Sequence, residues 1–415
     1  MNHTIFFVSS LLVAFQVICS GTNHNITKDY ENQIKRRRFQ DLPPFKAPVI
    51  GPCVKHPENC NLSPILKAEI VSYRPAVETI VREVLDGESK GRAYKELGKF
   101  VDLFGARVSG SKALEDSIDY MLDQMKQNGL QNVHGEEVVV PHYVRGEERA
   151  ELLTPRRKHL TLLGLDPSVG TPAQGIEADV LVVTSFEDLK AKAKQAKGKI
   201  IVFNQDWQGS YKTTAIYRIR GAIEAATVGG IATLIRSITD FSLNTPHTGG
   251  MTYEALIPEI PAACITVEDA ELLYRLQESG EKLRISFKMS IYKLPATTSR
   301  NVFGEITGNE KPNELVGLSG HIDSWDVGQG ALDDAGGTQI SVEALYLLKR
   351  LGLTTHRTLQ AILWTSEEAA AVGVGVADYV KRHDKELANF SAVFESDSGT
   401  FNATGLDFAG SEEAG

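Results

Sequence analysis

The chain has 415 residues, of which 42% are hydrophobic and 23% are charged, a composition typical of soluble globular proteins. Its formal net charge of −9 leaves no basic field for polyphosphate and excludes nucleic acid as the main partner. The length exceeds what one hydrophobic core usually organises, so we expect two domains, one inserted into the other, and a small molecule or a peptide as substrate.

Residues 1–20 predict a secretory signal peptide. An apolar stretch from Ile5 to Cys19 is short for a bilayer span and ends in small residues. An uncleaved anchor is the alternative, because only His3 and the terminal amine supply positive charge before this stretch. No other segment is apolar enough to cross a membrane, so we expect a secreted protein without a membrane partner.

Two further features agree with secretion. The candidate glycosylation sites are Asn25, Asn61, Asn389 and Asn402, each in an Asn-X-Ser/Thr tripeptide. Cys53 and Cys60 lie in one proline-containing segment and predict a disulfide in an oxidising compartment. Cys264, within "IPAACITV", is predicted to be a buried strand residue that packs rather than reacts.

Residues 21–60 are polar, then basic, then rich in proline, with "KRRRF" at 35–39. One interpretation is a disordered leader. The other is a propeptide cut near Arg38, since exposed basic runs in secreted chains are read by processing proteases.

Residues 66–160 predict the first part of the main domain. The pattern is helical from 66 to about 130, and Gly129 ends a helix whose apolar side chains share one face. Strand-like stretches follow at 138–140 and 150–153.

Residues 165–290 differ in pattern from the segments on either side, with short apolar strands and helices in alternation, and predict an inserted α/β module. "GKIIVF" and "IATLIRS" are predicted strands, and "IRGAIEAATVGG" between them is a predicted helix. "IPAACITVEDAELL" predicts a strand followed by a helix, with Thr266 and Asp269 spaced as a capping box.

Residues 295–415 predict the second part of the main domain. The apolar strands "ELVGLSG", "TLQAILWTS" and "SAVFESD" recur with a helical pattern between the first two. This order predicts an α/β fold, with a mostly parallel sheet and flanking helices, interrupted by the inserted module.

Candidate ligands follow the carboxyl ends of these three strands. His321 follows the first strand, Glu367 and Glu368 the second, and Asp397 the third. In open α/β sheets this edge is where sites assemble, so we expect these groups to converge.

An imidazole with several carboxylates and no thiolate suits zinc in an open catalytic site, and a carboxylate can bridge two ions. Asp333, opening the helix after a glycine-rich turn, is the predicted bridge. Asp323 is predicted to accept the other ring N–H of His321.

The doublet Glu367-Glu368 is predicted to divide two roles. Neighbouring side chains at a strand end point in opposite directions, so one binds metal while the other acts as general base on water. Taken singly, each motif has an ordinary interpretation: a packed histidine, a helix N-cap, a solvated acidic face. Together at one sheet edge they predict a two-metal hydrolase.

The segments "GHIDSWDVGQGALDDAGG", "LWTSEE" and "ESDSGTF" closely resemble the co-catalytic di-zinc exopeptidases. "RIRGAIEAATVGGIATLIRS" and "IPAACITVEDAELL" resemble the inserted protease-associated domain of such enzymes, so the resemblance covers residues 66–415.

The resemblance implies two zinc ions per subunit and release of amino acids from short peptides, mainly dipeptides, by a secreted or lysosomal homodimer of carboxypeptidase or dipeptidase type. It implies Glu367 as base, a cis peptide between Asp333 and Asp334, and four ligands. His321 would serve one zinc, Asp333 would bridge, Glu368 would serve either ion, and Asp397 would complete the other sphere.

The sequence departs from the family pattern in two places. The segment "AAAVGVG" after Glu368 is poor in glycine, and no histidine follows His383, whereas the family's last metal ligand is a histidine well downstream of Asp397. We therefore expect a zinc exopeptidase fold that is incomplete at the C-terminus. The alternatives are a catalytically impaired peptidase-like binding protein, or a glutaminyl-cyclase-like acyltransferase with one zinc and no inserted domain.

Overall fold

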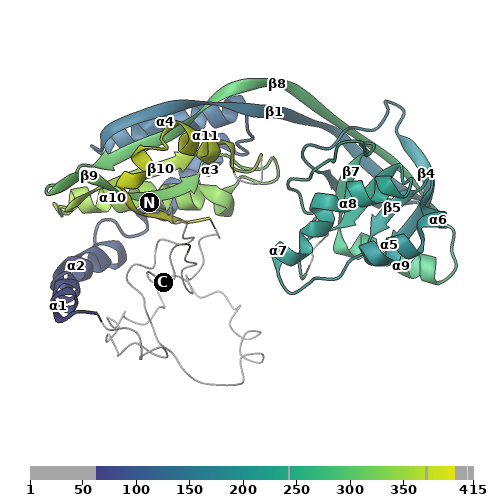
Figure 1. Ribbon diagram of the computed structural model, residues 1–415, viewed down its shortest axis with the longest axis horizontal. Helices are drawn as coiled ribbons and strands as arrows, with labels where there is room; N and C mark the ends of the chain where they lie inside the picture. The colour runs from purple at the N-terminus through teal and green to yellow at the C-terminus, as the bar shows by residue number, and fades with distance from the viewer. Residues whose placement is uncertain (1–61, 242–243, 370–372, 398–408, 410–415) are drawn as a thin grey trace.

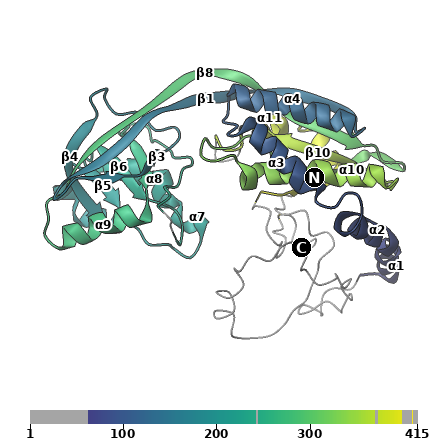
Figure 2. The same cartoon turned by 180° about the vertical axis from the view of Figure 1, so that it is seen from behind.

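The computed structural model describes residues 62–241, 244–369, 373–397 and 409. Two lobes are joined by two long antiparallel strands, β1 (Gln131–Thr154) and β8 (Arg284–Ile306), which form an arch between them (Figure 1). Seen from behind, the same two strands are the connection between the lobes (Figure 2). Because β1 and β8 run through both lobes, the second lobe continues the first through shared backbone hydrogen bonds.

The first lobe contains a sheet in the order β11-β9-β10-β8, with β1 paired to β8. The three apolar strands expected after residue 299 are confirmed as β9 (Lys311–His321), β10 (Arg357–Trp364) and β11 (Phe390–Glu395), and they pair in parallel. β8 is antiparallel to β10. The predicted α/β fold with a central sheet and flanking helices is confirmed, and its sheet is mixed because the arch strands enter it as a hairpin-like pair.

Helices cover both faces of this sheet. The helices of one face are α3 (Arg92–Phe104), α4 (Lys112–Gln127) and α10 (Gly336–Arg350), which pack with β8, β9 and β10 in one hydrophobic cluster. On the other face α11 (Val374–Arg382) packs through Val376 and Tyr379 against Phe303 and Trp364.

Helix α4 shows how local sequence sets these elements. The Ser111 side chain accepts a hydrogen bond from Leu114 N at 3.2 Å, which caps the first turn. Ile118 and Met125 lie on the same face of the helix and are fully buried. Gly129 adopts φ 73°, a left-handed conformation that ends the helix as predicted.

The second lobe is built on four parallel strands. They are β4 (Ile176–Val183), β5 (Ile200–Phe203), β6 (Ala232–Arg236) and β7 (Ala262–Ile265), with β3 (Leu162–Gly164) antiparallel at the edge and β4 paired to β8. β2 (Lys158–Leu160) pairs with β1. The helices of this lobe are α5 (Phe186–Ala191), α6 (Ala193–Ala196), α7 (Tyr211–Thr214), α8 (Ile216–Thr227) and α9 (Val267–Glu278).

The predicted capping box at α9 is half formed. The Thr266 hydroxyl accepts from Asp269 N at 3.1 Å, as expected. The Asp269 carboxylate instead pairs with Lys158 and accepts from Thr161 N, because β2 and the following turn pack over the helix start. Cys264 is fully buried in β7, and burial raises the pKa of its thiol to about 12, so the prediction that it packs is confirmed.

Helices α1 (Pro64–Ser72) and α2 (Arg74–Leu85) precede the first lobe and bury no residue. No helix in the described part of the chain has the length and apolarity needed to span a bilayer. The predicted signal peptide, the leader at 21–60, the Cys53–Cys60 disulfide, and the sequons of Asn25, Asn61 and Asn402 lie outside the described residues. Asn389 is exposed at the end of a short helix, η3 (Glu386–Asn389), just before β11.

Candidate metal and catalytic site

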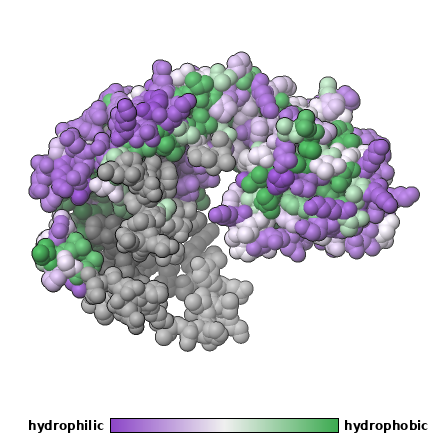
Figure 3. Space-filling model, in the orientation of Figure 1, coloured by the Kyte–Doolittle hydropathy of each residue, from purple (hydrophilic) through white to green (hydrophobic). Residues whose placement is uncertain are grey.

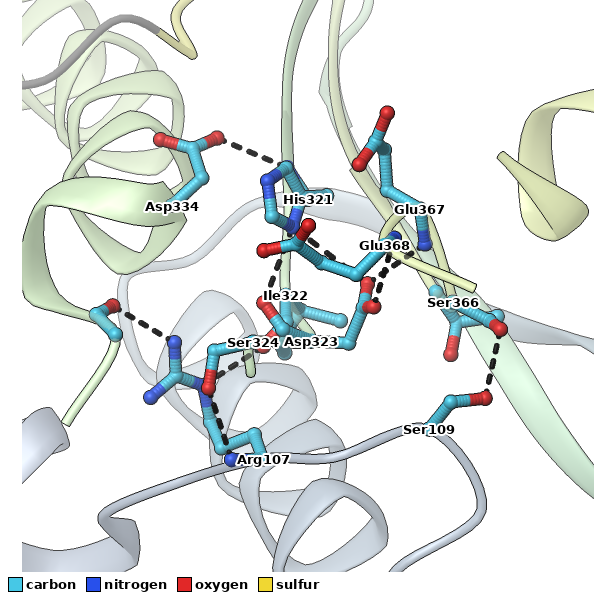
Figure 4. A network of polar contacts seen from close by, with 12 residues as sticks. Arg107, Ser109, His321, Ile322, Asp323, Ser324, Asp334, Ser366, Glu367 and Glu368 are labelled. Carbon is cyan, nitrogen blue, oxygen red and sulfur yellow. Dashed lines mark hydrogen bonds and ion pairs between the residues drawn. The ribbon is translucent and has the colours of Figure 1, made fainter. Parts of the chain in front are cut away.

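The candidate ligands gather at one edge of the first lobe's sheet. Trp364, the last residue of β10, lies opposite His321, the last residue of β9, and Glu395 at the end of β11 pairs with Ser319. Since these three strands are parallel neighbours, the segments that leave their carboxyl ends must meet, which explains the convergence expected from the sequence. Figure 4 shows the resulting network of polar contacts.

His321 is the centre of this network. Its Nδ1 contacts the carbonyl oxygen of Asp323 at 3.0 Å, and its Nε2 lies 3.0 Å from Asp333 Oδ1 and 3.2 Å from Asp397 Oδ1. Burial alone lowers the pKa of His321, but the surrounding carboxylates outweigh burial and raise it well above the usual value. A single ring nitrogen thus faces two carboxylates, and the backbone carbonyl fixes the ring orientation.

The structure corrects the predicted contact of the Asp323 carboxylate. Its Oδ1 is 3.6 Å from His321 Nδ1, farther than the backbone carbonyl of the same residue. The carboxylate accepts hydrogen bonds from Glu367 N at 2.9 Å and Glu368 N at 3.3 Å. Asp323 therefore orients His321 through its main chain and the glutamate turn through its side chain.

Glu367 and Glu368 leave this turn in different directions (Figure 4). The turn requires Ser366 to adopt φ 58°, which its hydrogen bond to Ser109 Oγ at 2.7 Å helps to hold. Burial raises the pKa of Glu367 to about 7. Burial and the Asp333 carboxylate also raise the pKa of Glu368, whose Oε1 is buried and has no hydrogen-bond partner among the described residues.

Asp333 and Asp334 lie in a distorted turn, η2 (Ala331–Ala335), and the peptide between them is cis, as the family resemblance implied. Asp333 does not sit at the helix start as predicted. Asp334 takes that position, where its oxygens accept from Gly337 N in the first turn of α10 at 2.8 Å and from His321 N at 3.0 Å. A carboxylate is favourable at this N-terminus, so Asp334 anchors the turn while the exposed Asp333 contacts His321.

A close approach of α10 to the end of β11 brings Asp397 into the site. A Cβ on Gly337 would lie 1.8 Å from the Ser396 carbonyl oxygen, so only glycine fits at this position. Gly337 therefore allows the close packing that places Asp397 beside the other candidate ligands.

Arg107, which was not predicted as a site residue, supports the 322–330 loop between β9 and η2. The side chain is fully buried and donates to the carbonyl oxygens of Ile322, Gln329 and Gly330 at 2.7–2.9 Å. Burial lowers its pKa only to about 10, so it stays charged. Arg107 and Ser109 precede α4, far from the motifs in sequence, and no local pattern marks them.

The arrangement fits a metal centre of nitrogen and oxygen ligands. His321, Asp333 and Glu368 offer ligand atoms within 4.8 Å of one another, and so do His321, Asp334 and Asp397. Asp334 is buried and Glu368 is partly buried, whereas Asp333 and Asp397 are exposed at the rim of the site. Carboxylates that share one imidazole repel one another, and a bound cation would compensate this repulsion. The unpartnered Oε1 of Glu368 is the clearest sign that such a cation belongs to the site.

Comparisons with known proteins agree with this geometry. The sequence model of Peptidase family M28 matches residues 301–415, which carry all the candidate ligands. Carboxypeptidase Q of Mus musculus is 49% identical over 349 residues, which are 84% of this chain and 74% of the mouse protein. The chain belongs to the carboxypeptidase Q group of peptidase family M28. As a member of this group it is a metallo-exopeptidase with peptide substrates, and its motifs resemble carboxypeptidase Q, also called plasma glutamate carboxypeptidase.

Further comparisons agree with the M28 assignment. Carboxypeptidase Q of Homo sapiens is 49% identical over 84% of this chain and 73% of its own length. The structure of a peptidase M28 precursor from Shewanella amazonensis is 31% identical with a TM-score of 0.75, over 79% of this chain and 75% of that chain. A zinc aminopeptidase from Bacillus subtilis, at 22% identity and a TM-score of 0.53 over 74% and 68%, shows the fold alone.

Proposed function

We propose that this M28 peptidase is a secreted zinc exopeptidase of carboxypeptidase or dipeptidase type that hydrolyses short peptides, mainly dipeptides. The observation that carries the proposal is the convergence of Asp333, Asp397 and the unpartnered Glu368 carboxylate around His321 Nε2. An imidazole with hard oxygens and no thiolate is typical of a catalytic zinc site rather than of a structural, cysteine-rich one.

Two zinc ions per subunit fit these residues. His321, Asp333 and Asp397 would hold one ion, because both carboxylates already contact the same ring nitrogen. This grouping places Asp397 with His321 rather than in the other sphere. Asp333 and Glu368 would serve the second ion, with Asp333 shared. Zinc in such a site supplies Lewis-acid polarisation of a carbonyl oxygen and lowers the pKa of a water molecule.

Glu367 is the proposed general base. Its pKa of about 7, raised by burial, suits a group that accepts a proton at neutral pH and then donates it to the leaving amine. Its side chain diverges from Glu368, so it is free for this exchange when Glu368 binds metal. The Asp323 carboxylate supports both roles because it holds the backbone N–H groups of the two glutamates.

Other parts of the proposal rest on sequence. Residues 1–20 would direct secretion or delivery to the lysosome, residues 66–160 and 295–415 would form the peptidase domain, and residues 165–290 would be an inserted protease-associated domain. The protein would act as a homodimer, with glycans at Asn25, Asn61, Asn389 and Asn402 and a Cys53–Cys60 disulfide. The exposed position of Asn389 is compatible with a glycan there.

The test is amino-acid release from a panel of dipeptides, with bound zinc counted on the same sample. We expect turnover that a chelator abolishes and added zinc restores. Absence of turnover in the zinc-loaded protein, with at most one zinc bound, would favour a peptidase-like binding protein instead.

A further inference from the structure

A second feature of the molecule faces the metal centre from the other lobe. The gap between the lobes opens below the arch of β1 and β8, and the space-filling view shows it as a hollow (Figure 3). In both ribbon views α7 lies on the side of the second lobe nearest the first (Figures 1 and 2). Helix α7 therefore borders this gap, and hydrogen bonds from Arg218 to Tyr211 and His247 join α8 and the 247–250 segment to it.

Arg145 of β1 connects the 247–250 segment of the second lobe to the loop that follows His321. Its guanidinium donates to both carboxylate oxygens of Asp326, at 2.6 and 2.9 Å, and Asp326 lies on the 322–330 loop that follows His321. The same guanidinium donates to Gly164 O at 2.7 Å and reaches Thr248 Oγ1 at 3.4 Å. Arg145 thus contacts both the 247–250 segment and the loop that follows His321.

Arg218, in the first turns of α8, is held next to that segment by neutral acceptors. Its Nε donates to Gly250 O at 3.0 Å, and one terminal nitrogen donates to the Tyr211 hydroxyl at 2.7 Å, Thr248 O at 3.1 Å and His247 Nε2 at 2.9 Å. Among the described residues no carboxylate forms an ion pair with Arg218. The guanidinium is only partly buried, and its second terminal nitrogen has no protein partner in the same part of the chain.

The neighbouring arginines of this lobe differ from Arg218. Arg220, two positions along α8, pairs with Glu224 at 3.3 Å and Glu254 at 2.7 Å. Arg236 pairs with Asp206 and Glu271. Although the chain has a net charge of −9, Arg218 has no carboxylate partner within the described residues. The remaining terminal nitrogen of this fixed guanidinium is suited to donate a charge-assisted hydrogen bond to a carboxylate.

His247 keeps this fork in place without adding charge. Burial and the positive charge of Arg218 lower the pKa of His247 to about 4, so at neutral pH its Nε2 accepts the Arg218 hydrogen bond. The Asp333 carboxylate of the first lobe opposes this lowering of the pKa, so His247 lies within electrostatic range of the metal site.

We infer that Arg218, positioned by Tyr211 and His247, binds the free α-carboxylate of the peptide whose scissile bond lies at the metal centre. Substrates would then be recognised jointly by the two lobes, with the scissile bond on the first and the C-terminal carboxylate on the second. The inference rests on the proposed exopeptidase activity and adds the chemical group that selects the substrate. It assigns the second lobe a direct role in specificity.

The test compares a dipeptide acid with its C-terminal amide. For alanyl-alanine, R218M is expected to lower kcat/KM by about 10- to 100-fold, mostly through KM, because a charge-assisted hydrogen bond is lost. For alanyl-alanine amide the same variant should change kcat/KM by no more than about twofold. R220M, which removes the ion-paired neighbour on the same helix, is the matched control and should leave both substrates unaffected.

Two additional measurements separate the role of Arg218 from misfolding of the variant and from failure of peptide hydrolysis. Y211F removes only the hydroxyl that holds Arg218 and, since Tyr211 is exposed, should fold normally and weaken the acid substrate alone by about threefold. Calorimetric binding of free leucine and leucinamide needs no turnover, so it tests Arg218 even where peptide hydrolysis fails. An equal loss for acid and amide, or leucine binding unchanged in R218M, would overturn the inference.

Discussion

The carboxylate of Asp323 accepts a hydrogen bond from the backbone N–H of Glu367 at 2.9 Å, which joins the loop after β9 to the turn after β10. The second oxygen of the same carboxylate accepts from Glu368 N at 3.3 Å. The fully buried Asp323 therefore fixes the relative position of the proposed base and a proposed ligand.

Replacing Asp323 by Asn tests this relationship. Asparagine offers one acceptor oxygen for two N–H groups, and its amide nitrogen opposes the second, so the glutamate turn should loosen. Zinc affinity and kcat are expected to fall by about 10- to 100-fold, as for other residues that orient metal ligands. D378N, which alters a partly exposed aspartate on α11 that pairs with Arg382, is the control. Unchanged zinc affinity and kcat in D323N would show that the turn does not depend on this carboxylate.

The two glutamates should be separable by metal content. E367Q removes a group that accepts a proton, so kcat is expected to fall by about 10²- to 10⁴-fold while bound zinc stays at the wild-type level. E368Q removes a proposed ligand, so bound zinc itself should decrease. Turnover and elemental analysis on the same preparations provide both readouts. Loss of zinc in E367Q with retention in E368Q would reverse the two assignments.

Arg107 is predicted to be essential for stability. R107M would remove the buried guanidinium that donates to the carbonyl oxygens of Ile322, Gln329 and Gly330, so the free energy of unfolding should decrease by about 3 kcal/mol or more. R107K should restore little, because an ammonium cannot reproduce the planar fork. Denaturant unfolding measures the change, with the exposed Arg156 changed to Met as control. A change of less than about 1 kcal/mol in R107M would contradict the assigned support of the loop.

Asp166 predicts a pH-dependent change in stability. Burial raises its pKa to about 6, against the favourable charges of Lys293 and Arg145. A folded pKa above the ordinary 3.8 means that the native state binds more protons than the unfolded state between about pH 4 and 6. The contribution of Asp166 to stability is therefore complete below pH 4 and is lost as pH rises through about 6.

D166N should accordingly be more stable than wild type at pH 8, by about 1–3 kcal/mol, and equal to it near pH 4. Denaturant midpoints measured at both pH values test the sign. D179N, at an exposed position beside Arg284, should show no such dependence. A wild type that is more stable than D166N at pH 8 would mean that Arg145 and Lys293 outweigh the cost of burying the charge.

The sequence by itself determined the elements and the residue types of the site. Short apolar runs predicted β5 and β6, a small-residue helical pattern predicted α8, and an apolar helical face predicted α4. The strand-end positions of His321, Glu367 and Asp397 predicted that they converge. These signals are local: a side-chain period, a cap, or the end of an apolar run is written in a few neighbouring residues.

Only the tertiary structure decided which groups contact which. The 24 residues of β1 include polar stretches that no period marks as strand, and they extend because β8 pairs with them across the whole arch. Arg107 meets Ile322 over 215 positions of sequence, and the Asp323 carboxylate meets Glu367 over 44. Such contacts carry no local signal, because they depend on the packing of elements that are brought together only when the chain folds.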